Sequence, residues 1–236
     1  MKVTLINHTA NAVDTLLFTK NTRLQMMASN MDRMNDISDA QKLVELEYIS
    51  NTIKSSWEFI DYTFMIEGVS RAFTHQLVRN RMGSYAQQTM RILDVSGFDY
   101  VTGPTIAADE EMCGIYADMM GLIQDTYELL IEKGAAIEDA RGILPTNIHT
   151  NIVAKYNLRT LSDMMASRSS PRTQGEYREV IEQMYDAVLE VHPWCDDFLM
   201  GKKQIAAKKL DSLITNDYEG TKEYLNYIKL IDILRN

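Results

Sequence analysis

Residues 60–66 read Ile60-Asp61-Tyr62-Thr63-Phe64-Met65-Ile66, and this stretch decides the fold class. Apolar and aromatic side chains stand at every second position, with more polar positions between them. Successive side chains of a β-strand point to opposite faces, so this alternation is typical of a strand with one buried face. It is the clearest strand pattern in the sequence, and the other elements are predicted around it.

Most of the remaining chain has helical patterns. Ser38 and Gln41 form a capping pattern before one helix, and Ile115, Met119 and Leu122 fall on one apolar stripe of another. Residues 149–155 fit either a strand or an irregular crossing. A short strand is predicted at residues 3–6, and helices at residues 12–19, 39–53, 70–78, 104–134, 137–142, 157–166 and 177–191.

Helices therefore dominate over a modest sheet. We expect an α+β fold, with a single domain over residues 1–236, a small, mostly antiparallel sheet and several helices. The chain has only four prolines and eleven glycines, and no stretch resembles a flexible linker. The number and order of the strands do not follow from these patterns.

Composition argues against several classes of partner. The net charge of −9 disfavours a nucleic-acid polymer as the main partner. The N-terminus is neither a signal peptide nor a membrane span, and no apolar window of about 18 residues occurs, so no membrane association is expected. Cys113 and Cys195 match no metal or redox spacing, and the four histidines lack a metal-site spacing. We therefore expect no metal and a reducing cytoplasm.

Two windows of this acidic chain are basic. Residues 70–91 contain four arginines and no acidic residue, and residues 140–175 contain five basic residues against Asp163 alone. Such windows favour a focused site for a small, multiply charged anion. Two solvated basic faces are the alternative that charge alone leaves open.

The first window contains the motif Arg79-Asn80-Arg81-Met82-Gly83-Ser84-Tyr85-Ala86-Gln87-Gln88-Thr89-Met90-Arg91. It is dense in hydrogen-bond donors. The planar fork of arginine matches phosphate oxygens bidentately, and side-chain amides suit the edges of uracil or isoalloxazine rings. Gly83 would let the backbone turn closely against a ligand. The motif therefore predicts a nucleotide-like ligand.

This motif resembles the signature of the flavin-dependent thymidylate synthases. That signature is Arg-His-Arg, two variable residues, Ser, one variable residue, Asn-Glu, one variable residue, Ser, one variable residue and Arg. Four positions match at the same spacing: Arg79, Arg81, Ser84 and Arg91. Thr89 replaces the later serine, and the chain has Asn80 for His, Ala86 for Asn and Gln87 for Glu.

Other blocks resemble the same family in the same order. Ser55-Ser56-Trp57-Glu58-Phe59 lies upstream of the predicted strand. The downstream blocks are Ala140-Arg141-Gly142-Ile143-Leu144-Pro145, Asn157-Leu158-Arg159-Thr160-Leu161 and Arg168-Ser169-Ser170-Pro171-Arg172-Thr173-Gln174-Gly175-Glu176. The spacings between them agree without a gap, and the similarity covers roughly residues 50–195.

The resemblance implies which residues form the sites. The nucleotide would be surrounded by Gln76, Arg79, Gln87, Gln88, Thr89, Met90, Arg91, Arg141 and Arg168. The flavin would be contacted by Ser55, Arg79, Asn80, Arg81, Met82, Gln87, Asn157, Arg159, Asp163 and Arg172. Arg172 replaces a histidine of the family and Asp163 an asparagine, so the flavin contacts there depart from the family pattern.

The resemblance also implies a chemistry. In this family a one-carbon unit passes from 5,10-methylenetetrahydrofolate to C5 of dUMP to give dTMP, and NADPH reduces FAD. Arg168 would be the catalytic residue, stabilising negative charge that develops on N3 and O2 of the pyrimidine. Neither Cys113, in a helical stripe, nor Cys195, beside Asp196 and Asp197, has an activating setting for thiolate attack. Family members are homotetramers with sites built across subunit interfaces.

Two alternatives remain open from the sequence. The departures at Asn80, Ala86 and Gln87 are compatible with a variant that makes 5-hydroxymethyl-dUMP, in which the methylene is hydrated instead of reduced. They are also compatible with a catalytically inactive protein that binds a flavin or a nucleotide.

Overall fold

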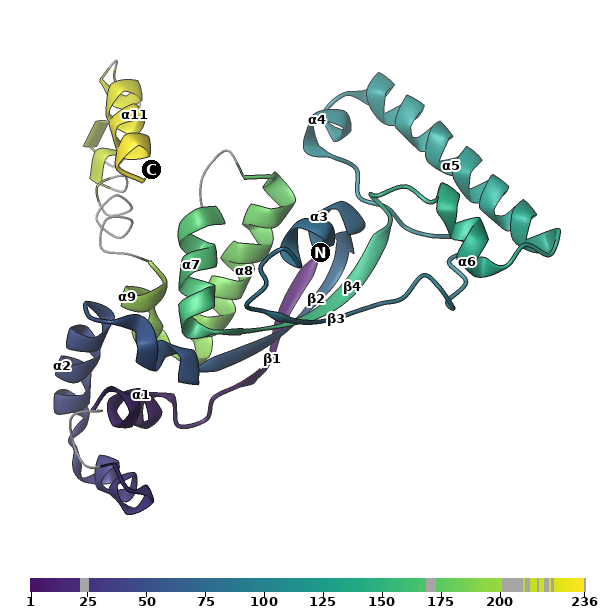
Figure 1. The fold of residues 1–236 in the computed structure, drawn as a ribbon. Coiled ribbons are helices and arrows are strands. Elements are labelled where there is room, and N and C mark those ends of the chain that lie inside the picture. The colour runs from purple at the N-terminus through teal and green to yellow at the C-terminus, as the bar shows by residue number, and fades with distance from the viewer. Residues whose placement is uncertain are drawn as a thin grey trace. The chain divides into compact units, whose positions relative to one another are not determined.

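The protein has an α+β fold built on one small sheet (Figure 1). The computed structural model describes residues 1–21, 26–168, 173–200, 210, 213–215, 217–218, 221 and 223–235. The described sheet is antiparallel, has four strands and follows the order β1-β2-β4-β3. Its strands are β1 (Lys2–His8), β2 (Asp61–Ser70), β3 (Ser84–Gln87) and β4 (His149–Asn157). The predicted fold class is confirmed, and residues 149–155, left open by their pattern, form a strand.

The chain divides into two compact units, and the division falls inside β1, β2 and β4. The first unit comprises Met1–Lys2 and Met65–Ala154, and the second comprises Val3–Phe64 and Lys155–Asn236. Each unit is described below by itself. The expectation of a single domain over residues 1–236 stays a prediction.

The first unit contains one long helix, α5, and several short helical elements. Ser70 accepts a hydrogen bond from the Phe73 amide at 3.0 Å and so caps α3 directly after β2. The helical elements of this unit are α3 (Arg71–Leu77), α4 (Pro104–Ala107), α5 (Glu110–Glu132), α6 (Ile137–Ala140) and η4 (Arg141–Ile143). Its buried core contains Ile66, Val69, Phe73, Leu77, Phe98, Met120, Tyr127, Ala140, Ile148, Ile152 and Ala154.

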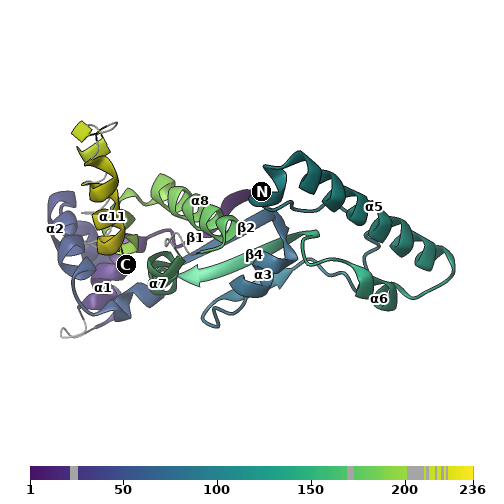
Figure 2. The ribbon, with the colours of Figure 1, turned by 90° about the horizontal axis from the view of Figure 1, so that it is seen from above.

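Helix α5 differs from its sequence-based prediction in two respects. The predicted run after Pro104 is broken, because Asp109 accepts from the Met112 amide at 2.9 Å and starts a new helix there. In addition, the predicted apolar stripe is exposed, with Ile115 at 66%, Met119 at 51% and Leu122 at 59% exposure. Helices α4 and α6 pack on α5, and much of its length lies outside these contacts (Figure 2).

The second unit is mainly helical. Its helical elements are α1 (Ala12–Lys20), η1 (Ala28–Asn30), η2 (Asp32–Asp36), α2 (Asp39–Ser50), η3 (Lys54–Phe59), α7 (Leu158–Arg168), α8 (Gly175–Val191), η5 (Pro193–Cys195), α9 (Asp196–Leu199) and α11 (Tyr224–Arg235). The capping box of Ser38 and Gln41 is confirmed at the start of α2. That helix ends at Ser50, before the predicted residue 53, because the Asn51 side chain donates to the Glu47 carbonyl at 2.7 Å.

A buried polar network joins β2 to the end of α8 and to η5. The Tyr62 hydroxyl lies 2.9 Å from His192 Nδ1 and 3.1 Å from Cys195 Sγ. Burial, and then the nearby His8, lowers the pKa of His192 to about 4. Burial raises the pKa of the Cys195 thiol to about 12. One arrangement satisfies all three groups, in which the thiol donates to the tyrosine oxygen and the hydroxyl donates to neutral His192.

The start of α7 depends on the last residue of β4. Asn157 Oδ1 accepts a hydrogen bond from the Thr160 amide at 2.8 Å, which is the geometry of a helix N-cap. The Leu158 amide donates to the Ile60 carbonyl at 2.7 Å, so the helix start is also tied to the residue before β2. Asn157, a predicted flavin contact, therefore has a structural function within the chain.

The network around His192 predicts a loss of stability in acid. The pKa of His192 falls from about 6.5 to about 4 on folding. The unfolded chain therefore binds this proton more readily, and the stability that neutral His192 contributes is complete above pH 6.5 and is lost towards pH 4. We expect His192→Gln to flatten this part of the pH dependence of the unfolding free energy in urea, whereas His149→Gln, at an exposed position, should not. An unchanged pH dependence in His192→Gln would contradict the assignment.

The cap at Asn157 predicts a specific stability pattern. Asn157→Ala should lower the free energy of unfolding by about 1 kcal/mol, because the Thr160 amide loses its acceptor. Asn157→Ser should retain most of the stability, since serine is also a good N-cap. Urea denaturation followed by circular dichroism measures both. Equal losses in the two variants would show that the cap does not carry the effect.

Candidate functional site

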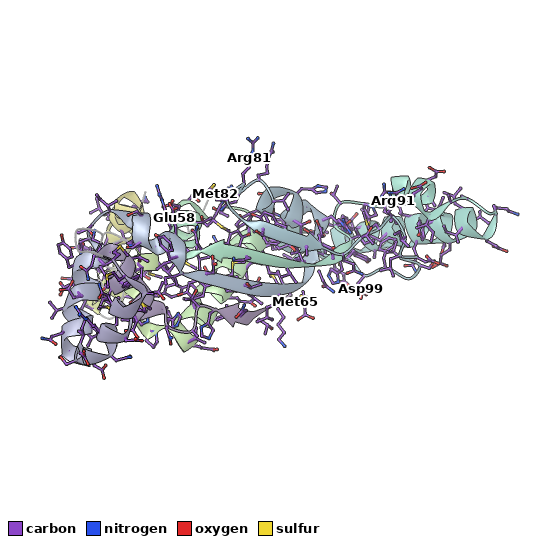
Figure 3. All side chains as sticks on the ribbon, turned by 60° about the horizontal axis from the view of Figure 1, so that its bottom comes forward. Glu58, Met65, Arg81, Met82, Arg91 and Asp99 are labelled. Carbon is purple, nitrogen blue, oxygen red and sulfur yellow. The ribbon has the colours of Figure 1, made fainter. Side chains whose placement is uncertain are left out.

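The first part of the motif forms a turn after α3. The Gly83 amide donates to the Asn80 carbonyl at 3.2 Å, and the Met82 amide donates to Asn80 Oδ1 at 3.3 Å. The Tyr85 hydroxyl donates a hydrogen bond to the Asn80 carbonyl at 2.6 Å, which stabilises the turn. Arg81 and Met82 stand at its tip, and the Arg81 side chain extends away from the ribbon (Figure 3). Asn80, which replaces the family histidine, thus shapes this turn.

The middle of the motif is strand β3, which was not predicted from the sequence. The Gln87 amide nitrogen lies 2.8 Å from Thr74 Oγ1 and 3.4 Å from Thr150 Oγ1. The backbone amide of Gln88 donates to the backbone carbonyl of Asn151 at 3.0 Å. Gln87 therefore donates to hydroxyls of both α3 and β4, which a glutamate carboxylate at this position would not do.

The end of the motif meets α6 and η4. Arg91 Nε lies 2.8 Å from Glu138 Oε2, and the Arg91 amide donates to Thr89 Oγ1 at 3.1 Å. Arg141 Nε donates to the Glu138 carbonyl at 3.1 Å. The structure thus brings Arg91 and Arg141, which lie in different sequence blocks, to the same residue of α6.

Several arginines of the first unit lack an acidic partner. Four of its arginines have no carboxylate within ion-pair distance among the residues that the structure describes: Arg71, Arg79, Arg81 and Arg141. Arg71 was not among the predicted site residues. The sequence signal that could have identified it is its place at the start of the acid-free window, residues 70–91. Arginines without a carboxylate partner are suited to an anionic ligand.

Two ion pairs link η3 and α7 in the second unit. Arg159 on α7 forms an ion pair with Glu58 on η3. Lys54 on η3 contacts Asp163 on α7 at 3.1 Å, and its ammonium lies 4.9 Å from the Trp57 ring centroid. In one ion pair the cation is on α7 and the carboxylate on η3, and in the other the cation is on η3 and the carboxylate on α7. The carboxylate that departs from the family pattern, Asp163, has its own cation.

Arg168 is the last residue of α7. Its guanidinium lies 4.9 Å from the centroid of the Tyr177 ring on α8, a cation–π geometry. This contact orients a side chain that would otherwise have many rotamers. Arg172 lies outside the described residues.

The predicted residues are divided between the two units. Those in the first are Gln76, Arg79, Asn80, Arg81, Met82, Gln87, Gln88, Thr89, Met90, Arg91 and Arg141, and those in the second are Ser55, Asn157, Arg159, Asp163 and Arg168. Ser55 is exposed on η3 and Gln76 is half-buried in α3. Most of the predicted nucleotide contacts thus share one compact unit, and Arg168 is the exception.

The described residues were also searched for a reactive thiol, a metal site and a membrane-spanning helix. The Cys195 thiol has a raised pKa, as expected, but burial is the main cause rather than the neighbouring acids. Among the described residues, no group of three histidine, cysteine or acidic side chains is arranged to hold a metal ion. Within the same part of the chain, every helix is too short or too polar to cross a membrane.

Comparisons with known proteins identify the family of this chain. A family model described as "Thymidylate synthase complementing protein" matches residues 4–194. A flavin-dependent thymidylate synthase of Geobacter sulfurreducens is 31% identical over 197 residues, covering 82% of this chain and 84% of the relative. The enzyme of the same name from Pyrococcus furiosus is 32% identical over 192 residues, covering 79% and 78%. That of Nitratidesulfovibrio vulgaris is 40% identical over 144 residues, covering 58% and 59%. The chain therefore belongs to the flavin-dependent thymidylate synthase family.

Proposed function

We propose that this protein transfers a one-carbon unit from 5,10-methylenetetrahydrofolate to C5 of dUMP to give dTMP, with FAD as its flavin and NADPH as the reductant. Family membership supports the reaction type. The observation that carries the substrate assignment is that four arginines of the first unit have no carboxylate within ion-pair distance among the described residues. A mononucleotide supplies the anion that such a group lacks.

Nucleotide binding would use the motif and η4. Guanidinium forks bind phosphate oxygens bidentately. Gln88 is exposed, and its side-chain amide can form hydrogen bonds with a pyrimidine edge. Gln87 has a different function in this proposal. Its amide is engaged with Thr74 and Thr150, so it fixes β3 and thereby positions the residues that follow it.

Flavin binding fits the residues of the turn. Arg79 and Arg81 are exposed and without carboxylate partners among the described residues, which suits the diphosphate of an anionic dinucleotide. In the second unit, Ser55, Asn157, Arg159 and Asp163 would contribute, with Lys54 balancing the Asp163 carboxylate. Bound flavin supplies the reducing equivalents that convert the transferred carbon into a methyl group.

Arg168 would act on the pyrimidine. Its guanidinium stabilises negative charge developing on N3 and O2, which makes C5 nucleophilic without a thiolate. Tyr177 assists by holding the guanidinium against its ring. Burial keeps the Cys195 thiol protonated, which is consistent with a mechanism that uses no cysteine.

Assembly and location complete the proposal. The exposed apolar residues of α5, among them Ile115, Met119 and Leu122, are suited to contacts between copies in a homotetramer. Sites that combine subunits would allow the two basic windows of one chain to serve different sites. The free thiols of Cys113 and Cys195 accord with a reducing cytoplasm.

The balance between Lys54 and Asp163 predicts a double-mutant pattern in FAD affinity. Lys54→Met should raise the Kd for FAD about fivefold, because Asp163 is left to repel the anionic ligand. Lys54→Met combined with Asp163→Asn should return to near the wild-type value. Quenching of flavin fluorescence during titration measures the Kd.

Lys42→Met is the matched control for this cycle, because Lys42 pairs with Asp14 at 2.7 Å in the same unit. It should leave FAD affinity unchanged. Purely additive effects of the Lys54 and Asp163 changes would contradict the coupling.

Arg168 is predicted to be essential for turnover. Arg168→Ala should lower the rate of dTMP formation by about 10²–10³-fold, the usual cost of removing a group that stabilises developing charge. Arg168→Lys should be nearly as slow, because a point charge cannot replace a planar two-pronged contact. Affinity for FAD should be retained in both. Arg178→Lys, on α8, is the control, and near-normal turnover in Arg168→Ala would remove this residue from the mechanism.

Cysteine chemistry is predicted to be dispensable. Cys113→Ser and Cys195→Ser should each keep most of the wild-type turnover, because neither thiol lies where a thiolate is stabilised. Serine at position 195 also preserves a hydrogen-bonding partner for Tyr62. Loss of turnover with unchanged circular dichroism in either variant would mean that a thiolate takes part.

A further inference from the structure

A surface cavity of the second unit is lined by residues that the proposed reaction does not use. Its volume is about 530 Å³, which lies in the range of small-molecule sites. The cavity is bordered by the end of β1, by the first turns of α1 and α2, and by residues 191–194 at the junction of α8 and η5. None of the predicted flavin or nucleotide contacts is among its lining residues. A ligand bound here would therefore be held by a separate set of side chains.

His192 provides a hydrogen-bond donor at the wall of this cavity. The residue is only 7% exposed, and its Nδ1 accepts the hydrogen bond of the Tyr62 hydroxyl in the network described above. Because Nδ1 is the acceptor of a neutral ring, the ring proton is on Nε2. This nitrogen has no hydrogen-bond partner among the described residues, and it is not one of their fully buried polar atoms. Its N–H is therefore left for a ligand.

Trp194 provides a second donor beside the first. Its ring centroid lies 5.2 Å from that of His192, the residue is half-buried, and it lines the same cavity. Within the described part of the chain the indole N–H has no hydrogen-bond partner, and an indole nitrogen can only donate. The His8 ring packs edge-on against His192 at 4.9 Å between centroids. Two donors held by ring packing thus face a ligand that must supply acceptors.

The charged groups of the lining favour an acceptor with negative charge. The Lys42 ammonium lies 2.7 Å from Asp14 Oδ1 and keeps further donors, and both side chains are mostly buried. The Asn11 side chain does not cap α1, so the first amides of that helix add partial positive charge at the cavity. Asp39 is the lining carboxylate without an ion-pair partner among the described residues, but it is exposed and screened by solvent.

Apolar side chains complete the lining. Leu46 is buried, Val13 is half-buried and Leu43 is 61% exposed. Acetate or inorganic phosphate would use the donors alone. An organic acid with an apolar group would also remove these side chains from water.

We propose that this cavity binds a small organic carboxylate with an apolar or aromatic group, whose oxygens accept hydrogen bonds from His192 Nε2 and Trp194 Nε1. The apolar group packs against the side chains contributed by α1 and α2. The inference does not rest on the proposed function, because it uses none of the predicted flavin or nucleotide contacts.

The test compares three probes on the FAD-loaded protein in excess dUMP, which keeps carboxylates away from the predicted nucleotide contacts. Isothermal titration calorimetry measures the Kd of phenylacetate, of phenylacetamide, which lacks the charge, and of acetate, which lacks the ring. We expect phenylacetate to bind about tenfold more tightly than either of the others, because only phenylacetate uses both the donors and the apolar lining.

Two variants each remove one donor. Trp194→Phe keeps a ring without an N–H, and His192→Asn keeps a polar group at the level of Nδ1 for Tyr62 but none at the position of Nε2. Each should weaken phenylacetate binding about 10- to 100-fold, the range for a lost hydrogen bond to a charged group. Trp57→Phe is the matched control, because it removes the other tryptophan N–H of the chain, which does not line the cavity. It should leave the Kd unchanged.

Three results would overturn the proposal. The first is the absence of phenylacetate binding at millimolar concentration. The second is equal affinity for phenylacetate and phenylacetamide, which would show that the carboxylate is not recognised. The third is an unchanged Kd in Trp194→Phe, which would place the binding elsewhere, and this variant decides the matter alone if His192→Asn does not fold.

Discussion

The absence of counter-charge around the arginines of the first unit is the constraint on which the account of this protein depends. Folding collects Arg71, Arg79, Arg81 and Arg141 in one compact unit and gives none of them a carboxylate in the described part of the chain. In a protein of net charge −9, acidic residues are abundant enough to neutralise these groups if stability alone mattered. Arg71 and Arg141 are close enough for the charge of one to lower the pKa of the other, and a bound anion would offset this repulsion.

Several cations of the second unit have partners within the chain. There, Lys54 and Arg159 each have an acidic partner across η3 and α7, and Arg168 lies on an aromatic ring. Exposed ion pairs of this kind contribute little to stability, about 1 kcal/mol at most. Their effect is on the local potential, which they keep close to neutral. The contrast is between particular residues: Lys54 and Arg159 each have an acidic partner, whereas Arg79, Arg81 and Arg141 have none in the described part of the chain.

The helices that carry the motifs start at the ends of the two long strands. Ser70 ends β2 and caps α3, and Asn157 ends β4 and caps α7. Alternating side chains made β2 recognisable from the sequence, whereas β4 was left open between a strand and an irregular crossing; the capping box before α2 was also predictable. These features are local, because the spacing of residues within one element determines them.

The rest could not be predicted because it depends on tertiary contacts. Strand β3 has only four residues, and it is a strand because it pairs with β4 in the folded sheet. The apolar stripe of α5 was predicted correctly as a pattern, but periodicity does not say whether the chain itself or another copy covers it. Arg71 was missed because its buried Nε and the influence of Arg141 appear only in the folded chain. Family motifs gave the other site residues, and their contacts with ligands stay predictions.

The most direct test of the central claim is release of tritium from [5-³H]dUMP by the purified protein. The assay contains methylenetetrahydrofolate, NADPH and added FAD, with each omitted in turn, and the nucleotide product is identified by mass. We expect tritium release that requires all three additions, with a product carrying a methyl group at C5. Absence of release under conditions in which the protein binds both dUMP and FAD would contradict it.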